Sequence, residues 1–197
     1  MRCFGDGDEL YERYHDEEWG KPVTDERGVF ERLSLEAFQS GLSWRTILAK
    51  RPAFRAAFAD FDPEVVAGFG PDDEARLLAD AGIVRNRLKV AATIANARAT
   101  LELRAQGDDL ARLVWAHATP PDDPAARRPR TPADVPATTP ASTALAKELK
   151  GRGFRFVGPT TAYALMQAIG LVDDHLEGCV AREANEAARR AAWPAAG

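Results

Sequence analysis

Residues 142–169 read STALAKELKGRGFRFVGPTTAYALMQAI, and this stretch decides the fold. Ser142 is a typical N-cap residue and is expected to begin a helix that ends in the basic run before Gly151. A second helix is expected to begin at Pro159, because proline suits the first turn of a helix. Its inward face would carry apolar residues at helical spacing, namely Ala162, Leu165, Met166 and Ile169. The stretch therefore predicts two helices joined by a tight, glycine-bounded hairpin at 153–158.

The hairpin has the features of a phosphate-binding site. The second helix presents unpaired backbone N–H groups at its N-terminus, where the helix dipole favours an anion. Gly158 would let the DNA backbone approach closely, and Thr160 lies in the same first turn. Positive side chains flank the turn: Lys147, Lys150, Arg152 and Arg155. DNA contact is one interpretation of this pattern, and an ordinary helix end with solvated basic residues is the other.

The remainder of the chain also favours helices. Ala, Leu, Glu and Arg dominate from Asp25 to Gln106, and alternating runs of β-branched residues are nearly absent. An all-α fold is predicted. One helix is expected from Thr24 or Asp25 to Gly41, and Ser43 is expected to cap the next. Further helices are expected at 52–59, 63–68, 72–81 and 87–106.

The domain organisation follows from composition. Residues 1–180 are predicted to form a single domain of two packed helical lobes, interrupted by a Pro-rich surface loop at 119–140. The Ala- and Arg-rich stretch 181–197 is predicted to be a frayed helix or a disordered tail. With 197 residues and 45% hydrophobic content, the chain can bury a sizeable core by itself, and a monomer is expected.

Charge and targeting signals narrow the class of protein. The net charge of -4 argues against a surface coated with basic residues, so any DNA contact must come from a local patch. No secretory signal and no run of about 20 apolar residues is present, which predicts a cytoplasmic protein without a membrane partner.

Four residues are candidate metal ligands. If residues 175–179 were helical, His175 and Cys179 would share one face, and Cys3 and His15 could supply the other half of a tetrahedral zinc site. Such a site would join the N- and C-terminal segments and would be structural. A Cys3–Cys179 disulfide, disfavoured by a reducing cytoplasm, and two isolated buried thiols are the alternatives. His117 is assigned no role.

A carboxylate occurs among aromatic residues in two segments. Tyr11, Tyr14 and Trp19 crowd one short stretch, and Glu36 precedes a turn that presents Trp44. An aromatic slot can hold a flat heterocycle by stacking, and a carboxylate beside it can accept hydrogen bonds from an exocyclic amine or favour a cationic base. The alternative is that these aromatics are core residues and that Glu36 pairs with an arginine such as Arg32 or Arg45.

Several stretches resemble the 3-methyladenine DNA glycosylase I family. They are 11–20 (YERYHDEEWG), 35–44 (LEAFQSGLSW), 80–87 (DAGIVRNR) and 151–158 (GRGFRFVG), together with His175 and Cys179. The resemblance covers about residues 2–179 in order. It implies a helix-hairpin-helix glycosylase that binds double-stranded DNA containing alkylated bases and removes 3-methyladenine by hydrolysis, without lyase chemistry.

The resemblance also implies site residues. It places zinc at Cys3, His15, His175 and Cys179, and a base-binding site at Tyr11, Tyr14, Glu36 and Trp44, with Gln39 and Ser40 on its rim. The family usually carries a Trp shortly after its first cysteine, whereas Phe4 follows Cys3 here. We expect Phe4 to replace that Trp.

Two other classes of function fit parts of the pattern. A zinc-stapled helical DNA-binding module would use the hairpin but would not need Glu36 among aromatic residues. A metal-dependent hydrolase would need an open zinc site, which two Cys and two His ligands would close.

Overall fold

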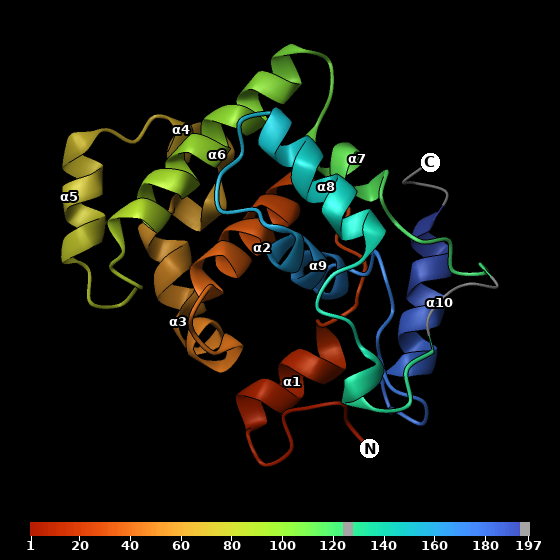
Figure 1. Ribbon diagram of the computed structural model, residues 1–197. Helices are drawn as coiled ribbons and strands as arrows, with labels where there is room; N and C mark the ends of the chain where they lie inside the picture. The colour runs from red at the N-terminus through yellow and green to blue at the C-terminus, as the bar shows by residue number, and fades with distance from the viewer. Residues whose placement is uncertain (124–127, 194–197) are drawn as a thin grey trace.

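The computed structural model describes residues 1–123 and 128–193, and these form ten α-helices and no strand (Figure 1). The all-α prediction is confirmed. The helices are α1 (Glu9–Glu17), α2 (Glu26–Gln39), α3 (Trp44–Ala57), α4 (Pro63–Ala67), α5 (Pro71–Ala79), α6 (Arg87–Ala105), α7 (Leu110–Trp115), α8 (Pro140–Gly151), α9 (Pro159–Ala168) and α10 (Arg182–Ala192). Two short 3-10 segments, η1 (Ala59–Phe61) and η2 (Pro132–Asp134), complete the set.

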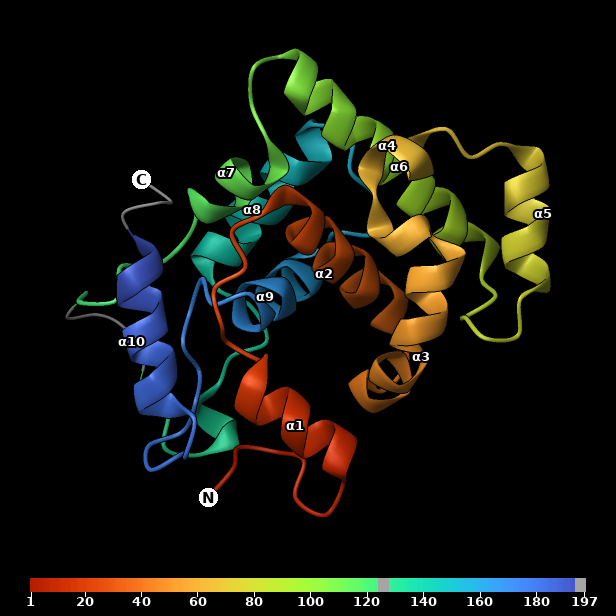
Figure 2. The same ribbon diagram turned by 180° about the vertical axis from the view of Figure 1, so that it is seen from behind.

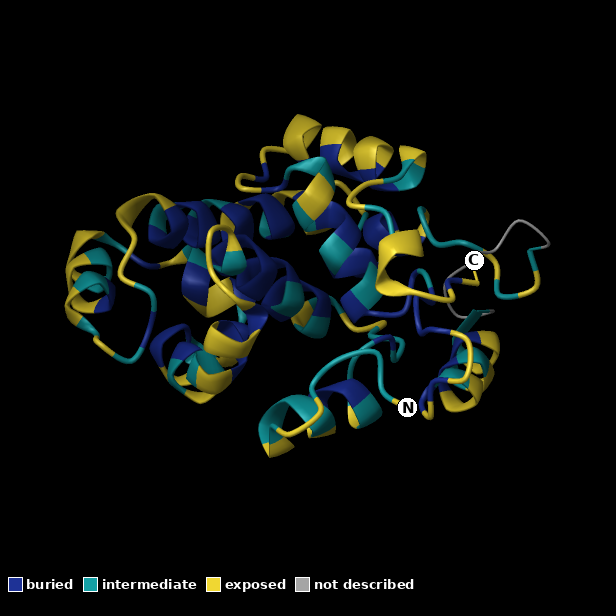
Figure 3. Ribbon diagram, turned by 60° about the horizontal axis from the view of Figure 1, so that its bottom comes forward, coloured by how far each residue is buried: buried dark blue, intermediate teal, exposed yellow. Residues whose placement is uncertain are grey.

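Helix α2 lies at the centre of the molecule. It packs against α3, α6, α7 and α9, and Figure 3 shows buried residues concentrated along it and its neighbours. Nine of its residues are buried, including Phe30, Leu33 and Phe38. The ring of Phe38 also packs against those of Phe54 and Phe58. Because its core face is so fully buried, α2 is a rigid support for the side chains near its C-terminal end.

Side-chain caps begin both α2 and α3, as predicted. Asp25 accepts a hydrogen bond from the Gly28 N–H at 2.8 Å, and Ser43 accepts one from the Thr46 N–H at 3.2 Å. Gly41, with a φ of +81°, takes the left-handed conformation that ends α2.

The separate helix predicted at 52–59 is wrong, because α3 runs through Pro52 without a break. The proline removes one backbone donor, yet Ile47 on one side of it and Phe54 on the other are both fully buried. Burial of a common apolar face outweighs the local cost of the proline. Helices at 63–68, 72–81 and 87–106 are confirmed as α4, α5 and α6, within a few residues at their ends.

The helix-hairpin-helix is present, with one correction. Helix α8 begins three residues earlier than predicted, because Thr139 rather than Ser142 is its N-cap. The two residues form a reciprocal capping box: Thr139 Oγ1 accepts from the Ser142 N–H at 3.1 Å, and Ser142 Oγ accepts from the Thr139 N–H at 2.9 Å. Helix α9 begins at Pro159 as predicted, and α8 packs directly on α9.

Helices α1 and α7 were not predicted. Of the two possibilities for the C-terminal stretch, the structure shows a helix over residues 182–192, and Asn185 and Arg189 of this helix are buried. Residues 194–197 and Pro124 of the Pro-rich loop lie outside the described residues. Within the described part of that loop, only η2 is regular. No helix in the described parts of the chain is long and apolar enough to cross a membrane.

The N-terminal segment meets the loop that precedes α10. Residues 175–179 are irregular apart from a turn at 177–178, and they do not form the helix on which the spacing argument depended. They reach the N-terminal segment instead: the Val180 N–H donates to the Met1 carbonyl at 3.1 Å, and the Leu176 N–H donates to Cys3 Sγ at 3.2 Å. Figure 2 shows the N-terminal segment beside the loop that precedes α10.

Candidate active site

Aromatic rings from α1 and α3 form a cluster at the end of α2. The ring centroids of Tyr14 and Trp44 lie 5.4 Å apart, and those of Tyr11 and Tyr14 lie 6.4 Å apart with stacked planes. Tyr14 and Trp44 are buried, with 2% and 8% of their surface exposed, whereas Tyr11 is half-buried. Phe4 joins the cluster with its centroid 4.8 Å from that of Tyr11.

Glu36 of α2 faces this cluster without an ionic partner. Its side chain is 6% exposed, and it makes no hydrogen bond to any other described residue. Burial raises the pKa of Glu36 to about 8, and only the more distant charge of Arg32 opposes that shift. The Glu36 charge in turn contributes to the raised pKa of both Tyr11 and Tyr14, whose main cause is burial.

The two arginines that could have neutralised Glu36 are committed elsewhere. Arg32 donates to Glu18 at 2.9 Å and to Glu31 at 3.2 Å, and Arg45 pairs with Asp8. Glu36 is therefore a buried, protonatable carboxyl group that stays available to a ligand, rather than half of a core ion pair.

A second polar group in the cluster lacks a partner. Trp44 Nε1 is buried and donates no hydrogen bond in the described structure. A buried unpaired donor costs about 1–3 kcal/mol, so its persistence at a candidate site is consistent with satisfaction by a bound molecule. The indole donor and the Glu36 carboxyl group could together read the polar edge of a flat heterocycle.

The end of α2 carries the two residues predicted for the rim of the base-binding site. Gln39 is the last residue of α2, and Ser40 is its exposed C-cap. Lys89, which the sequence analysis did not identify, reaches from α6 and donates to the carbonyls of Phe38 at 2.8 Å and Ser40 at 2.6 Å. Its ammonium group satisfies helix-end carbonyls and fixes this rim. No local signal in the sequence marks Lys89, because its acceptors lie 49 and 51 residues away.

The predicted DNA-binding residues form an exposed basic edge. Lys150, Arg152, Arg155 and Thr160 are exposed, and Gly158 is the N-cap of α9. No side chain caps this helix, so its first N–H groups are available to an anion. Arg152 also donates to Gln106 Oε1 at 2.9 Å, which anchors one cation of the edge to the end of α6.

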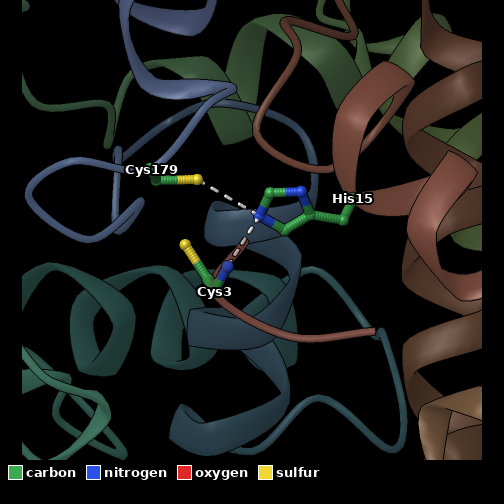
Figure 4. Close-up of side chains that lie close together, drawn as sticks. All are labelled: Cys3, His15 and Cys179. Carbon is green, nitrogen blue, oxygen red and sulfur yellow. Dashed lines mark hydrogen bonds between the residues drawn. The ribbon is translucent and has the colours of Figure 1, made fainter. Parts of the chain in front are cut away.

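Three of the four predicted metal ligands are brought together. Figure 4 shows Cys3, His15 and Cys179 side by side, and their ligand atoms all lie within 4.8 Å of one another. Cys179 Sγ is 3.4 Å from His15 Nε2, and both cysteines are free thiols, so the disulfide alternative is not observed. The fourth predicted ligand, His175, is adjacent: its ring centroid is 5.2 Å from that of His15.

Carboxylates orient both histidine rings. Asp16 Oδ1 lies 2.8 Å from His15 Nδ1, and Asp173 Oδ1 lies 2.8 Å from His175 Nδ1. A carboxylate at Nδ1 fixes the tautomer in which Nε2 carries the lone pair, which is the usual arrangement of ligating histidines. His15 Nε2 accepts from the Cys3 N–H at 3.1 Å, and His175 Nε2 lies 3.1 Å from Asn185 Nδ2. Burial lowers the pKa of His15 and raises that of the Cys3 thiol to about 12. His117, assigned no role, pairs with Glu148 at 2.8 Å.

Comparison with known proteins identifies the family to which this chain belongs. The family model described as methyladenine glycosylase matches residues 4–183. The chain belongs to the methyladenine glycosylase family. DNA-3-methyladenine glycosylase 1 of Escherichia coli (strain K12) is 46% identical over 179 residues, which cover 91% of this chain and 95% of that relative. This methyladenine glycosylase is therefore an enzyme that hydrolyses an N-glycosidic bond.

Solved structures support the same family. A crystal structure of 3-methyladenine DNA glycosylase I matches this methyladenine glycosylase with a TM-score of 0.86 and 47% identity, covering 91% of this chain and 98% of that chain. A tyrosine-to-phenylalanine variant of 3-methyladenine DNA glycosylase I in complex with 3-methyladenine matches with a TM-score of 0.83 and 35% identity. It covers 91% of this chain and 96% of that chain. The family match ends at residue 183, so most of α10 lies beyond it.

A cavity lies elsewhere in this methyladenine glycosylase. Its volume is about 460 Å³, and its lining includes Tyr163 of α9, Asp174, and Arg189 of α10. The lining also includes Asp123 and Arg128, which flank residues 124–127, and these four lie outside the part of the chain that the structure describes. None of the aromatic cluster or Glu36 lines it, so this cavity is separate from the candidate active site.

Proposed function

We propose that this glycosylase excises 3-methyladenine from alkylated double-stranded DNA by hydrolysis, as a monofunctional enzyme. The observation that carries the proposal is the buried Glu36 carboxyl group, unpaired and surrounded by Tyr11, Tyr14 and Trp44. A DNA-binding module without catalysis would have no use for such a group, because an uncompensated buried carboxyl group lowers stability. The relative that is 46% identical to this chain is named for the same base.

In the proposed complex, the flipped base stacks on the rings of Tyr14 and Trp44, with Tyr11 beside them and Gln39 and Ser40 on the rim. An N3-methylated adenine carries positive charge in DNA, so an aromatic and acidic surrounding favours it over normal bases. Glu36 accepts a hydrogen bond from the exocyclic amine when ionised. Its raised pKa lets the cationic base itself shift the carboxyl group toward the charged form.

The chemistry needs little help from a general acid. Methylation makes the base a good leaving group, which departs neutral, so the enzyme must extrude the nucleotide, select the base and admit water to the sugar carbon. Flipping costs a few kcal/mol and less for a damaged base. Glu36 could also stabilise the positive charge that develops on the sugar or orient water, and the size of the effect of Glu36→Gln separates these roles.

The absence of lyase chemistry is part of the proposal. A lyase needs a free amine at the sugar carbon to form a Schiff base. The proposed base-contacting residues Tyr11, Tyr14, Glu36 and Trp44 offer no amine, and the Lys89 ammonium group on the rim is engaged by two carbonyls. Borohydride treatment of a reaction mixture should therefore trap no covalent protein–DNA adduct.

The Cys and His residues of the N-terminal segment and of the loop before α10 would hold a structural zinc ion. Two thiols and two imidazoles match the ligand preference of zinc, and both imidazoles have Nδ1 held by a carboxylate. When bound, the ion would tie Cys3 and His15 to His175 and Cys179 and stabilise the fold. Four protein ligands leave no position for a reactive water, so the ion is assigned no step in the reaction.

Base release from methylated duplex DNA tests the function. We expect chromatography to detect free 3-methyladenine with the wild-type protein and a lower rate with Trp44→Ala. Glu36→Gln losing less than about tenfold in rate, or about 1.4 kcal/mol, would assign Glu36 to recognition, and a larger loss to charge stabilisation.

Matched controls keep the result specific. Glu31→Gln alters the other buried carboxylate of α2, which is ion-paired with Arg55, and Trp115→Phe alters an indole that donates to the Val23 carbonyl. Both should keep base release if they fold. No release from folded, zinc-loaded wild-type protein would contradict the proposal and favour a DNA-binding module.

A further inference from the structure

The hairpin between α8 and α9 carries an exposed aromatic ring. Phe154 and Val157 are buried, and the two residues between them, Arg155 and Phe156, are exposed. Phe156 has 39% of its surface exposed, although two residues earlier a phenylalanine is anchored in the core. A plain extended segment would alternate and bury one of the two central side chains.

Backbone conformation explains the outward ring. Phe156 has a φ of +57°, a left-handed conformation that is unfavourable for a residue with a side chain. This turn lets both Arg155 and Phe156 point away from the core. Asparagine or glycine would adopt the same conformation at lower cost, so a phenylalanine here suggests that the ring itself is used.

A buried amide holds the turn. Asn96 of α6 is 1% exposed and makes two hydrogen bonds to one hairpin residue. Its Nδ2 donates to the Arg155 carbonyl at 3.1 Å, and its Oδ1 accepts from the Arg155 N–H at 2.7 Å. Asn96 therefore holds both backbone polar groups of Arg155, the residue before Phe156. With Arg155 fixed, the chain reaches the buried Val157 through the left-handed conformation of Phe156.

The groups around the Phe156 ring indicate the kind of partner that it contacts. The exposed cations Lys150, Arg152 and Arg155 share the hairpin region, and α9 begins there without a side-chain cap. Positive charge and free N–H groups suit phosphates, and an apolar ring suits the deoxyribose that alternates with them. A protein partner would not require so dense a set of cations around one aromatic side chain.

We propose that Phe156 is an apolar contact to the sugar-phosphate backbone of duplex DNA and that Asn96 is its positioning residue. The inference rests on the proposed function only in its choice of DNA as the partner. It assigns to this hairpin an apolar contact in addition to phosphate binding, so part of the affinity does not depend on salt.

Phe156→Gly provides the sharpest test. Glycine accepts the left-handed φ without strain, so the thermal midpoint should stay near that of the wild type or rise, whereas affinity for a duplex with an abasic-site analogue should fall about tenfold. Phe156→Leu should retain most of the affinity because it keeps an apolar side chain. Unchanged affinity of Phe156→Gly would overturn the proposal.

Salt dependence distinguishes a lost contact from a collapsed hairpin. In Phe156→Gly the slope of log affinity against log salt should equal that of the wild type, whereas Arg155→Gln should reduce it by about one. A reduced slope in Phe156→Gly would show that the hairpin has lost its cationic contacts, and the direct role would be wrong. Val65→Ala removes part of an exposed apolar side chain on α4, outside the hairpin, and is the control. It should leave the DNA affinity and its salt dependence unchanged.

A double-mutant cycle tests Asn96. Asn96→Ala should weaken DNA binding in the wild-type background and weaken it much less in the Phe156→Gly background, because the Phe156 ring that Asn96 positions is then absent. Equal losses in both backgrounds would contradict the positioning role. These outcomes are independent of catalysis: a wild type that fails to release 3-methyladenine refutes the proposed function, whereas equal DNA affinity of Phe156→Gly refutes this inference alone.

Discussion

Replacing Glu36 with glutamine should make the protein more stable, by an amount that grows as the pH rises. Burial raises the pKa of this carboxyl group from its ordinary 4.5 to about 8 in the folded protein. The folded state therefore holds a proton that the unfolded chain has released over this interval. Wild-type stability falls as the pH rises from about 4.5 to about 8 and then levels, and glutamine, which does not titrate, removes that loss.

The magnitude follows from the shift. Each pKa unit corresponds to about 1.4 kcal/mol, so the gain from Glu36→Gln should be about 3 kcal/mol at pH 7 and below about 1 kcal/mol at pH 5. Urea unfolding at pH 5, 6, 7, 8 and 9 measures it. With an m-value of about 2 kcal/mol/M, the midpoint difference at pH 7 should be about 1.5 M.

The pH dependence of the difference is the decisive quantity, because any constant packing change between the two side chains cancels. A difference that stays flat from pH 5 to pH 9 would refute the reasoning and would show that water or a partner solvates Glu36 in the folded protein. Glu31→Gln is a control for which the opposite change in stability is expected. Its carboxylate pairs with Arg55 and Arg32, so its removal should destabilise the protein near neutral pH.

Three further predictions concern the support of the site. Chelation of zinc, or Cys179→Ser, should lower the thermal midpoint while any protein still folded keeps its rate of base release; a loss of turnover without a loss of stability would instead indicate a catalytic ion. Lys89→Met should weaken binding of free 3-methyladenine, followed by Trp fluorescence, because two carbonyls at the end of α2 lose their donor; unchanged binding would exclude a role for Lys89 at the rim. Arg189→Met should cost about 2–4 kcal/mol in urea unfolding, because its buried guanidinium group donates to the carbonyls of Gly170, Leu171 and Thr119, and a change below about 0.5 kcal/mol would show that α10 is only loosely attached.

The sequence by itself determined the features that depend on near neighbours. The caps at Asp25 and Ser43 were predictable because a cap bonds to a backbone group three residues away. The start of α9 at Pro159 was predictable because proline suits the first turn of a helix. The family resemblance likewise depends on contiguous motifs, and the residue types around Glu36 were visible in two short stretches. The error at the start of α8 shows the limit, since Thr139 and Ser142 can both cap and only the completed capping box selects one.

Only the tertiary structure decided which charges meet. Arg32 lies four residues before Glu36 and was a reasonable partner for it, yet it pairs with Glu18 of another segment and leaves Glu36 buried and protonatable. The cluster of candidate metal ligands likewise unites Cys3 with Cys179 through loops rather than through the helical spacing that first indicated it. Ion pairs, ligand sets and buried amides such as Asn96 depend on which distant segment packs nearest, and that is set by burial of the whole core around α2 rather than by any local pattern.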